Sequence, residues 1–101
     1  MKKKVKVKVV IVRVGKAPQV EEIDDTLKAF QRIVGGLIES VPNGYGVVLF
    51  CTEDGRFLNL PFNRQCLGDF FFSQADKHGK SISLSDSEIE ILCKAYSLPS
   101  E

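Results

Sequence analysis

The sequence lacks the cysteine and histidine patterns that metal sites and disulfide frameworks need. It contains three cysteines, Cys51, Cys66 and Cys93, and a single histidine, His78. No pair of cysteines forms a CxxC motif, and His78 has no metal-site spacing to any of them, so we expect no metal site and no cofactor. Three separated thiols are typical of small buried side chains in a reducing compartment, and we expect a cytoplasmic location.

The sequence also lacks an excess of either charge and any long apolar run. Lysine and arginine total 14, whereas aspartate and glutamate total 13. This balance gives no overall field that would attract nucleic acid or an anionic membrane, so neither is an expected partner. No apolar stretch approaches the roughly 20 residues of a membrane helix, and the lysine-rich start leads into alternating valine and lysine rather than a signal-peptide core.

What the sequence does contain is enough for one domain, residues 1–101, with a single core. The start alternates, with lysines at 4, 6 and 8 on one strand face and valines at 5, 7 and 9 on the other. Residues 10–12 are apolar on both faces, so we expect the second half of this strand to be central. We interpret the lysine face as a solvated surface that prevents aggregation, with a phosphate-binding stripe as the alternative.

Residues 19–23 predict an edge strand that pairs back on the first, and residues 23–41 predict a long helix capped by Asp24 or Asp25. The pair Gly35-Gly36 is unfavourable in a helix by roughly 1 kcal/mol per residue. Either the glycines let the helix approach the sheet, another subunit or a ligand closely, or the helix ends there and residues 37–41 form a separate turn. A phosphate-binding glycine loop would instead precede a helix.

The second half of the chain predicts more strands and one further helix. Residues 47–51 form an apolar run typical of a central strand, and Asp54-Gly55 predicts a tight hairpin whose return strand spans residues 57–60. Another strand opens at residue 70, and residues 82–84 predict a brief one. Ser85 and Glu88 form a capping box that begins a helix ending by Pro99.

These elements together predict an α+β fold. We expect a single mixed or mainly antiparallel sheet with two helices packed on one face, because hairpin-connected strands do not supply the repeated crossovers of a doubly wound fold.

The stretch PFNRQCLGD, residues 61–69, is the expected binding segment. It concentrates hydrogen-bonding side chains on an irregular loop, namely Asn63, Arg64, Gln65 and Asp69. The structural alternative is that Asn63 forms a turn and Arg64 pairs with an acidic neighbour. We add Phe71 to the binding residues, because the triple 70–72 cannot all face one core and one ring is left for another layer, a subunit interface or a partner.

Five phrases in this order carry a resemblance: VKVVIVRVGKAP, a helix ending in Val-Gly-Gly, an acidic-Gly hairpin, Leu-Pro-x-Asn-Arg and GKSISLSDSEIE. Together the chain resembles a small uncharacterised domain family of bacterial phages, plasmids and other mobile elements. The resemblance covers most of the chain and implies no catalytic residue. The positions that match the recurring pattern are Gly35, Gly36, Asp54, Gly55, Pro61, Asn63 and Arg64.

Three functions follow as hypotheses. The first is a non-enzymatic protein of a mobile element that binds a host protein or a small anionic ligand through loop 61–69. The alternative is a homo-oligomer that binds or sequesters nucleotides, with Arg64 and the amino-terminal lysines on phosphates and a ring from residues 70–72 on a base. The third is an enzyme with Cys66 as nucleophile, assisted by Asp69 and His78.

Overall fold

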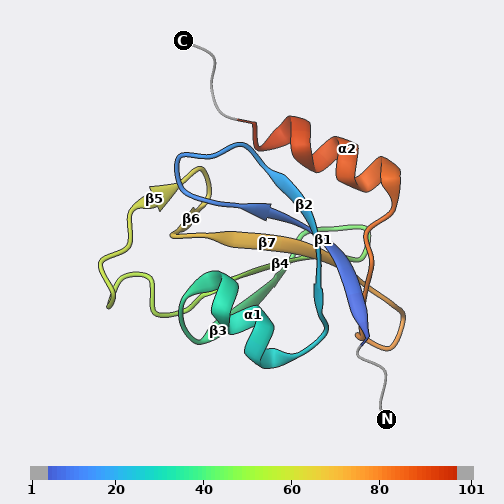
Figure 1. The fold of residues 1–101 in the computed structure, drawn as a ribbon, viewed down its shortest axis with the longest axis horizontal. Coiled ribbons are helices and arrows are strands. Elements are labelled where there is room, and N and C mark those ends of the chain that lie inside the picture. The colour runs from blue at the N-terminus through green and yellow to red at the C-terminus, as the bar shows by residue number, and fades with distance from the viewer. Residues whose placement is uncertain (1–4, 98–101) are drawn as a thin grey trace.

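The computed structural model describes residues 5–97 and is built on one antiparallel sheet (Figure 1). Its strands lie in the order β2-β1-β7-β4-β3, with β8 paired to β7, and every strand pairing among the described residues is antiparallel. The predicted α+β class with a mainly antiparallel sheet is therefore confirmed. The elements are β1 (Lys6–Val12), β2 (Gln19–Asp24), α1 (Leu27–Val34), β3 (Ile38–Pro42), β4 (Val47–Thr52), β5 (Phe62–Asn63), β6 (Cys66–Leu67), β7 (Phe70–Ala75), β8 (Ser81–Ile82) and α2 (Asp86–Ala95).

The core consists of two clusters, one on each face of the sheet. Strands β1, β4 and β7 lie inside the sheet, so both of their faces are covered and they are apolar almost throughout. One cluster contains Val10, Val12, Val47, Leu49, Cys51, Phe70, Phe72, Leu84 and Leu92. The other contains Val7, Val9, Ile11, Phe30, Val34, Phe50 and Phe71.

The expectation that both helices pack on one face is wrong. Phe30 and Val34 of α1 belong to one cluster, whereas Leu92 of α2 belongs to the other, so the helices cover opposite faces (Figure 1). Interior strands that are apolar on both sides need cover on both sides, and each helix supplies one layer.

The three consecutive phenylalanines follow the same alternation and are all 0% exposed. Phe71 stacks on Phe50 at 5.0 Å between ring centroids and meets Phe30 edge-on at 5.1 Å. Phe70 and Phe72 point to the other face, where both contact the Tyr96 ring that follows α2. The triple therefore joins two core layers, and none of its rings reaches the surface.

Helix α1 is shorter than the sequence predicted, and the residues after it form a strand. Gly35 has φ 80° in the left-handed region, and its N–H donates to Gln31 O, which ends the helix. Gly36 then lies so close to β4 that an added Cβ would stand 2.6 Å from Thr52 Oγ1. Gly35 therefore ends the helix, and Gly36 allows the close approach to the sheet. The expected separate turn at residues 37–41 is wrong, because residues 38–42 pair with β4 as strand β3.

Other local predictions have mixed outcomes. The edge strand at residues 19–23 and the Ser85–Glu88 capping box are confirmed. The cap of α1 is Thr26 rather than an aspartate. Residues 57–59 form turns and residue 60 has no regular structure, so the predicted return strand is wrong. Residues 2–4 of the lysine-rich start and Pro99 lie outside the described residues.

Candidate functional site

The segment between β4 and β7, residues 53–69, forms a loop with its own hydrogen bonds, and we call it the β4–β7 loop. Backbone bonds run from Leu58 N to Asp54 O at 2.8 Å, from Leu60 N to Gly55 O at 2.9 Å and from Gly68 N to Pro61 O at 2.8 Å. The short β5–β6 hairpin closes its second half. The loop is therefore ordered by its own hydrogen bonds.

Asn63 anchors this loop from inside. Its side chain is 4% exposed, and its amide nitrogen donates to the carbonyls of Val12 at 2.9 Å and Gly68 at 3.0 Å. Its carbonyl oxygen accepts from the Arg64 guanidinium at 2.9 Å. The side chain of Asn63, a predicted binding residue, therefore makes its hydrogen bonds within the protein itself.

Arg64 reaches across to the connection between β1 and β2. Its guanidinium donates to the backbone carbonyls of Arg13 at 3.3 Å and of Lys16. The alternative interpretation, an ion pair of Arg64 with an acidic neighbour, is wrong among the described residues, because the acceptors are two backbone carbonyls and the Asn63 side-chain oxygen. The positive φ of 57° at Arg64 is the backbone conformation that aims the side chain this way.

The other predicted site residues also contact the protein. Asp69 accepts from the Val14 N–H at 2.9 Å, Gln65 accepts from the Tyr96 hydroxyl, and Phe71 lies in the core. The structure brings Asn63, Arg64 and Asp69 together at the end of β1, where they hold the β1–β2 connection. In this structure their side chains do not form an open binding surface.

The β4–β7 loop also turns large apolar side chains outward. Phe57 is 93% exposed, Phe62 70% and Leu58 47%, and Leu37, just before β3, is also exposed. The Leu37 N–H donates to the Asp54 carboxylate, which ties this residue to the loop. Sequence reasoning missed this surface, because Phe57 and Leu58 in an apolar-rich stretch after Asp-Gly predict a strand as readily as an exposed loop.

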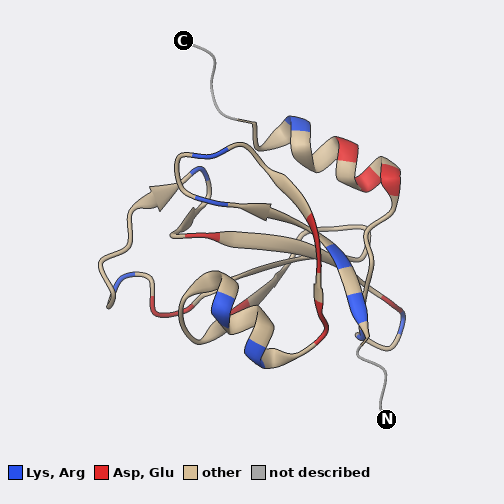
Figure 2. Cartoon of the chain, viewed as in Figure 1, with Lys and Arg blue, Asp and Glu red and all other residues tan. Residues whose placement is uncertain are grey.

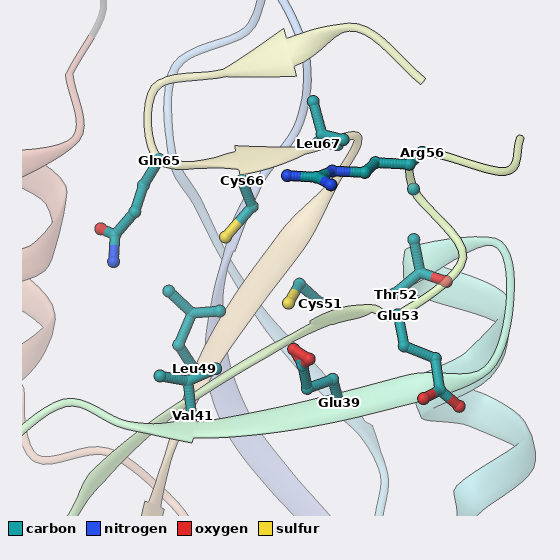
Figure 3. Close-up of a pocket in the computed structure, with 11 residues that line it drawn as sticks. Glu39, Val41, Leu49, Cys51, Thr52, Glu53, Arg56, Gln65, Cys66 and Leu67 are labelled. Carbon is teal, nitrogen blue, oxygen red and sulfur yellow. The ribbon is translucent and has the colours of Figure 1, made fainter. Parts of the chain in front are cut away.

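A hollow of about 380 Å³ lies between this loop and the sheet (Figure 3). Glu39 and Cys51 line it from the sheet, and Arg56 and Cys66 line it from the loop. The thiols of Cys51 and Cys66 point toward each other, with the Glu39 carboxylate beside Cys51. Burial, and then the neighbouring Cys51, raise the pKa of the Cys66 thiol to about 12.

The surroundings of the thiols raise their pKa values rather than lowering them. A nucleophilic cysteine needs a lowered pKa, whereas burial raises the pKa of Cys51 and of Cys93 as well. His78 lies in the turn after β7 and Asp69 lies before it, so the six residues of β7 separate the two. Among residues 5–97, no cluster of histidine, cysteine, aspartate or glutamate could hold a metal ion.

None of the helices in the described part of the chain is long and apolar enough to cross a membrane.

Comparison with known proteins assigns the chain to one family. It belongs to the family described as Domain of unknown function (DUF3846), which matches residues 7–97. No curated protein and no solved structure matches the chain.

Proposed function

We propose that this domain is a non-catalytic protein-binding module that contacts its partner through the β4–β7 loop. The observation that carries the proposal is the exposure of Phe57 and Phe62, 93% and 70%, on a loop that the buried Asn63 side chain fixes to β1. Large apolar side chains that gather on the surface are typical of an interaction site.

The construction of the loop supports binding rather than disorder. Asn63, Arg64 and Asp69 fix its second half to the end of β1, and Thr52 Oγ1 accepts from the Asp54 N–H at 3.1 Å where it begins. An aromatic side chain on such a frame loses little conformational freedom on binding. Rigid aromatic anchors are common hot spots of protein interfaces.

The chemistry of the exposed residues favours a protein over a small anion. The terminal guanidinium nitrogens of Arg64 are engaged by protein acceptors, and Phe70, Phe71 and Phe72 are buried, so neither Arg64 nor these rings are free to hold a nucleotide. Phe57 and Phe62 project outward, whereas small-ligand sites are concave. A phage or plasmid setting in a bacterial cytoplasm, as the resemblance implies, would make a host protein the partner.

The proposal is tested with a Phe57→Ser/Phe62→Ser double variant. The purified, tagged domain captures proteins from a bacterial lysate, and mass spectrometry compares their enrichment on the wild type and on the variant. Loss of a hot-spot aromatic costs about 2 kcal/mol or more, so we expect the specific partner to bind the variant at least ~30-fold more weakly.

Val20→Ser is the matched control, because Val20 is 45% exposed on β2, away from the loop. Both variants should keep the wild-type unfolding midpoint, since the altered side chains are exposed. A partner that binds the double variant as tightly as the wild type, or the absence of any partner lost from it, would refute the role of this loop.

A further inference from the structure

Strand β3 is the open edge of the sheet. It pairs only with β4 in the strand order, and Glu39, Ser40, Val41 and Pro42 are exposed. The opposite edge, β2, carries acidic residues along its length, as Figure 2 shows. Charges along an edge strand discourage further strand pairing, and β3 carries only one, at Glu39.

The hydrogen-bond register identifies which backbone groups of β3 face the open edge. The Asn43 N–H donates to Val47 O at 2.8 Å, and the Glu53 N–H donates to Leu37 O at 3.0 Å. In an antiparallel pair, every second residue bonds to the partner strand and the residues between them point away. The residues that bond to β4 are therefore Glu39 and Val41. Those that point their backbone groups outward are Ile38, Ser40 and Pro42.

Pro42 agrees with this assignment. Proline has no N–H to donate, and inside sheets it is confined to edge positions where its nitrogen faces outward. The open edge consequently offers N–H groups at Ile38 and Ser40, and carbonyls at all three outward residues. An extended chain is the one backbone conformation that can bond to this whole row.

The side chains of β3 separate two hollows, one on each face of the sheet. Glu39 and Val41 line the hollow of about 380 Å³ beneath the β4–β7 loop. Ile38, Ser40 and Pro42 line a second hollow, about 430 Å³, on the α1 face. Apolar side chains also line this second hollow, namely Leu27, Phe30, Val48 and Phe50. A strand added to β3 would therefore place successive side chains over alternate hollows.

We propose that the open edge of β3 binds an extended segment of a partner protein as an additional strand. The segment carries apolar side chains opposite Ile38 and Ser40, which enter the hollow on the α1 face. On the other face it carries a basic side chain opposite Glu39 and an apolar one opposite Val41. The inference deepens the proposed function, on which it rests, by naming the kind of partner.

The acidic residues beside β3 favour a basic side chain in the partner segment opposite Glu39. Glu39 and Glu53 line the same hollow, and neither carboxylate has an ion pair or side-chain hydrogen bond within residues 5–97. Arg56 lines that hollow from the loop, above the sheet (Figure 3). A lysine or arginine directly opposite Glu39 would form the cross-strand pair of opposite charges that stabilises neighbouring strands.

A second copy of the chain fits this edge less well. Two β3 strands paired about Ser40 would set Ile38 against Pro42 of the other copy. The Ile38 carbonyl would then face a nitrogen without hydrogen, and this loss would occur twice by symmetry. A segment of different sequence can donate at that position.

The test uses a fluorescent hexapeptide, Thr-Val-Val-Lys-Val-Thr, whose antiparallel register places lysine opposite Glu39 and the second valine opposite Ser40. Fluorescence anisotropy measures its dissociation constant. N-methylation of that second valine removes the N–H that bonds to Ser40 O, and we expect binding at least about tenfold weaker. N-methylation of the lysine, whose N–H points away from β3, is the matched control and should preserve binding.

Ser40→Pro tests the same contact from the protein side. The Ser40 N–H points away from β4, so proline removes an outward donor while the β3–β4 bonds remain. We expect at least about tenfold weaker peptide binding for Ser40→Pro and unchanged binding for Ser40→Ala. Circular dichroism and the unfolding midpoint establish that both variants are folded. If Ser40→Pro fails to fold, the pair of N-methylated peptides still decides the question.

The peptide and oligomer measurements also define the results that would contradict strand docking. Absence of peptide binding at millimolar concentration, or equal weakening by the two N-methylated peptides, would overturn the strand-docking proposal. A dimer in analytical ultracentrifugation that Ser40→Pro dissociates would assign the edge to a second copy instead. Peptide binding should be unchanged in Phe57→Ser/Phe62→Ser, so failure of strand docking and failure of the loop's proposed role are distinguishable.

Discussion

Replacement of Asn63 by alanine tests how the β4–β7 loop is held. The change removes three hydrogen bonds of a side chain that is 4% exposed: its donations to Val12 O at 2.9 Å and to Gly68 O at 3.0 Å, and its acceptance from Arg64 at 2.9 Å. A buried polar group left without its partner costs about 1–3 kcal/mol. With two buried carbonyls left without this donor, we expect a loss of about 2–4 kcal/mol in the free energy of unfolding.

Equilibrium unfolding in urea measures this loss. For a chain of this size the slope is about 1–2 kcal/mol per molar urea, so the midpoint should fall by about 1–4 M. Asn63→Asp keeps the shape of the side chain but loses the N–H donors, and at pH 7 it should be destabilised similarly. Phe62→Ser, in the same loop, should leave the midpoint unchanged because Phe62 is 70% exposed.

A loss below about 0.5 kcal/mol for Asn63→Ala would refute the assignment of Asn63 as the internal anchor, since surface substitutions have effects of this size. Stability of Asn63→Asp equal to that of the wild type would show that packing, rather than hydrogen-bond donation, holds the loop. The same measurements decide whether weak partner binding by an Asn63 variant reports a lost contact or an unfolded loop.

Three further predictions concern other parts of the fold. Gly36→Ala should lower stability by about 1–3 kcal/mol in urea unfolding, because the new Cβ would stand 2.6 Å from Thr52 Oγ1; a neutral effect would contradict this close approach. Ser85→Ala removes the capping box with Glu88 and should lower the unfolding midpoint by about 4–8 °C, equivalent to about 1 kcal/mol; an unchanged midpoint would count against the cap. The raised pKa of Cys66 means that the folded state holds its proton more tightly than the unfolded state, so stability should fall as pH rises from 9 toward 12; a Cys66→Ser variant whose stability falls equally would refute this source.

The polar segment at residues 61–69 illustrates what composition cannot reveal. Asparagine and arginine side chains indicate hydrogen-bond donation, but the acceptors can belong to a partner or to the chain's own backbone. Here the acceptors are carbonyls at the end of β1, some 51 positions earlier for Asn63 and Arg64. Only the folded structure brings these carbonyls to the loop, and the outward position of Phe57 and Phe62 follows from the same packing.

The glycine pair was informative because its physical cost required a reason. Two reasons were open, and the structure uses both, with Gly35 ending α1 and Gly36 allowing close contact with β4. The sequence did not predict that residues 38–42 pair with β4. That outcome depends on strand contacts absent from a local pattern, which read Leu37 and Val41 as a continued helical stripe.

Local signals by themselves determined the α+β class, the alternation of the first strand, the edge strand at residues 19–23 and the capped carboxyl-terminal helix. Each depends on neighbours within a few residues, through side-chain periodicity or a cap. Tertiary structure alone decided that the helices cover opposite faces, that the rings of residues 70–72 divide between two core layers, and that β3 is left as an open edge. These features arise from contacts between distant segments, which a local pattern permits but does not select.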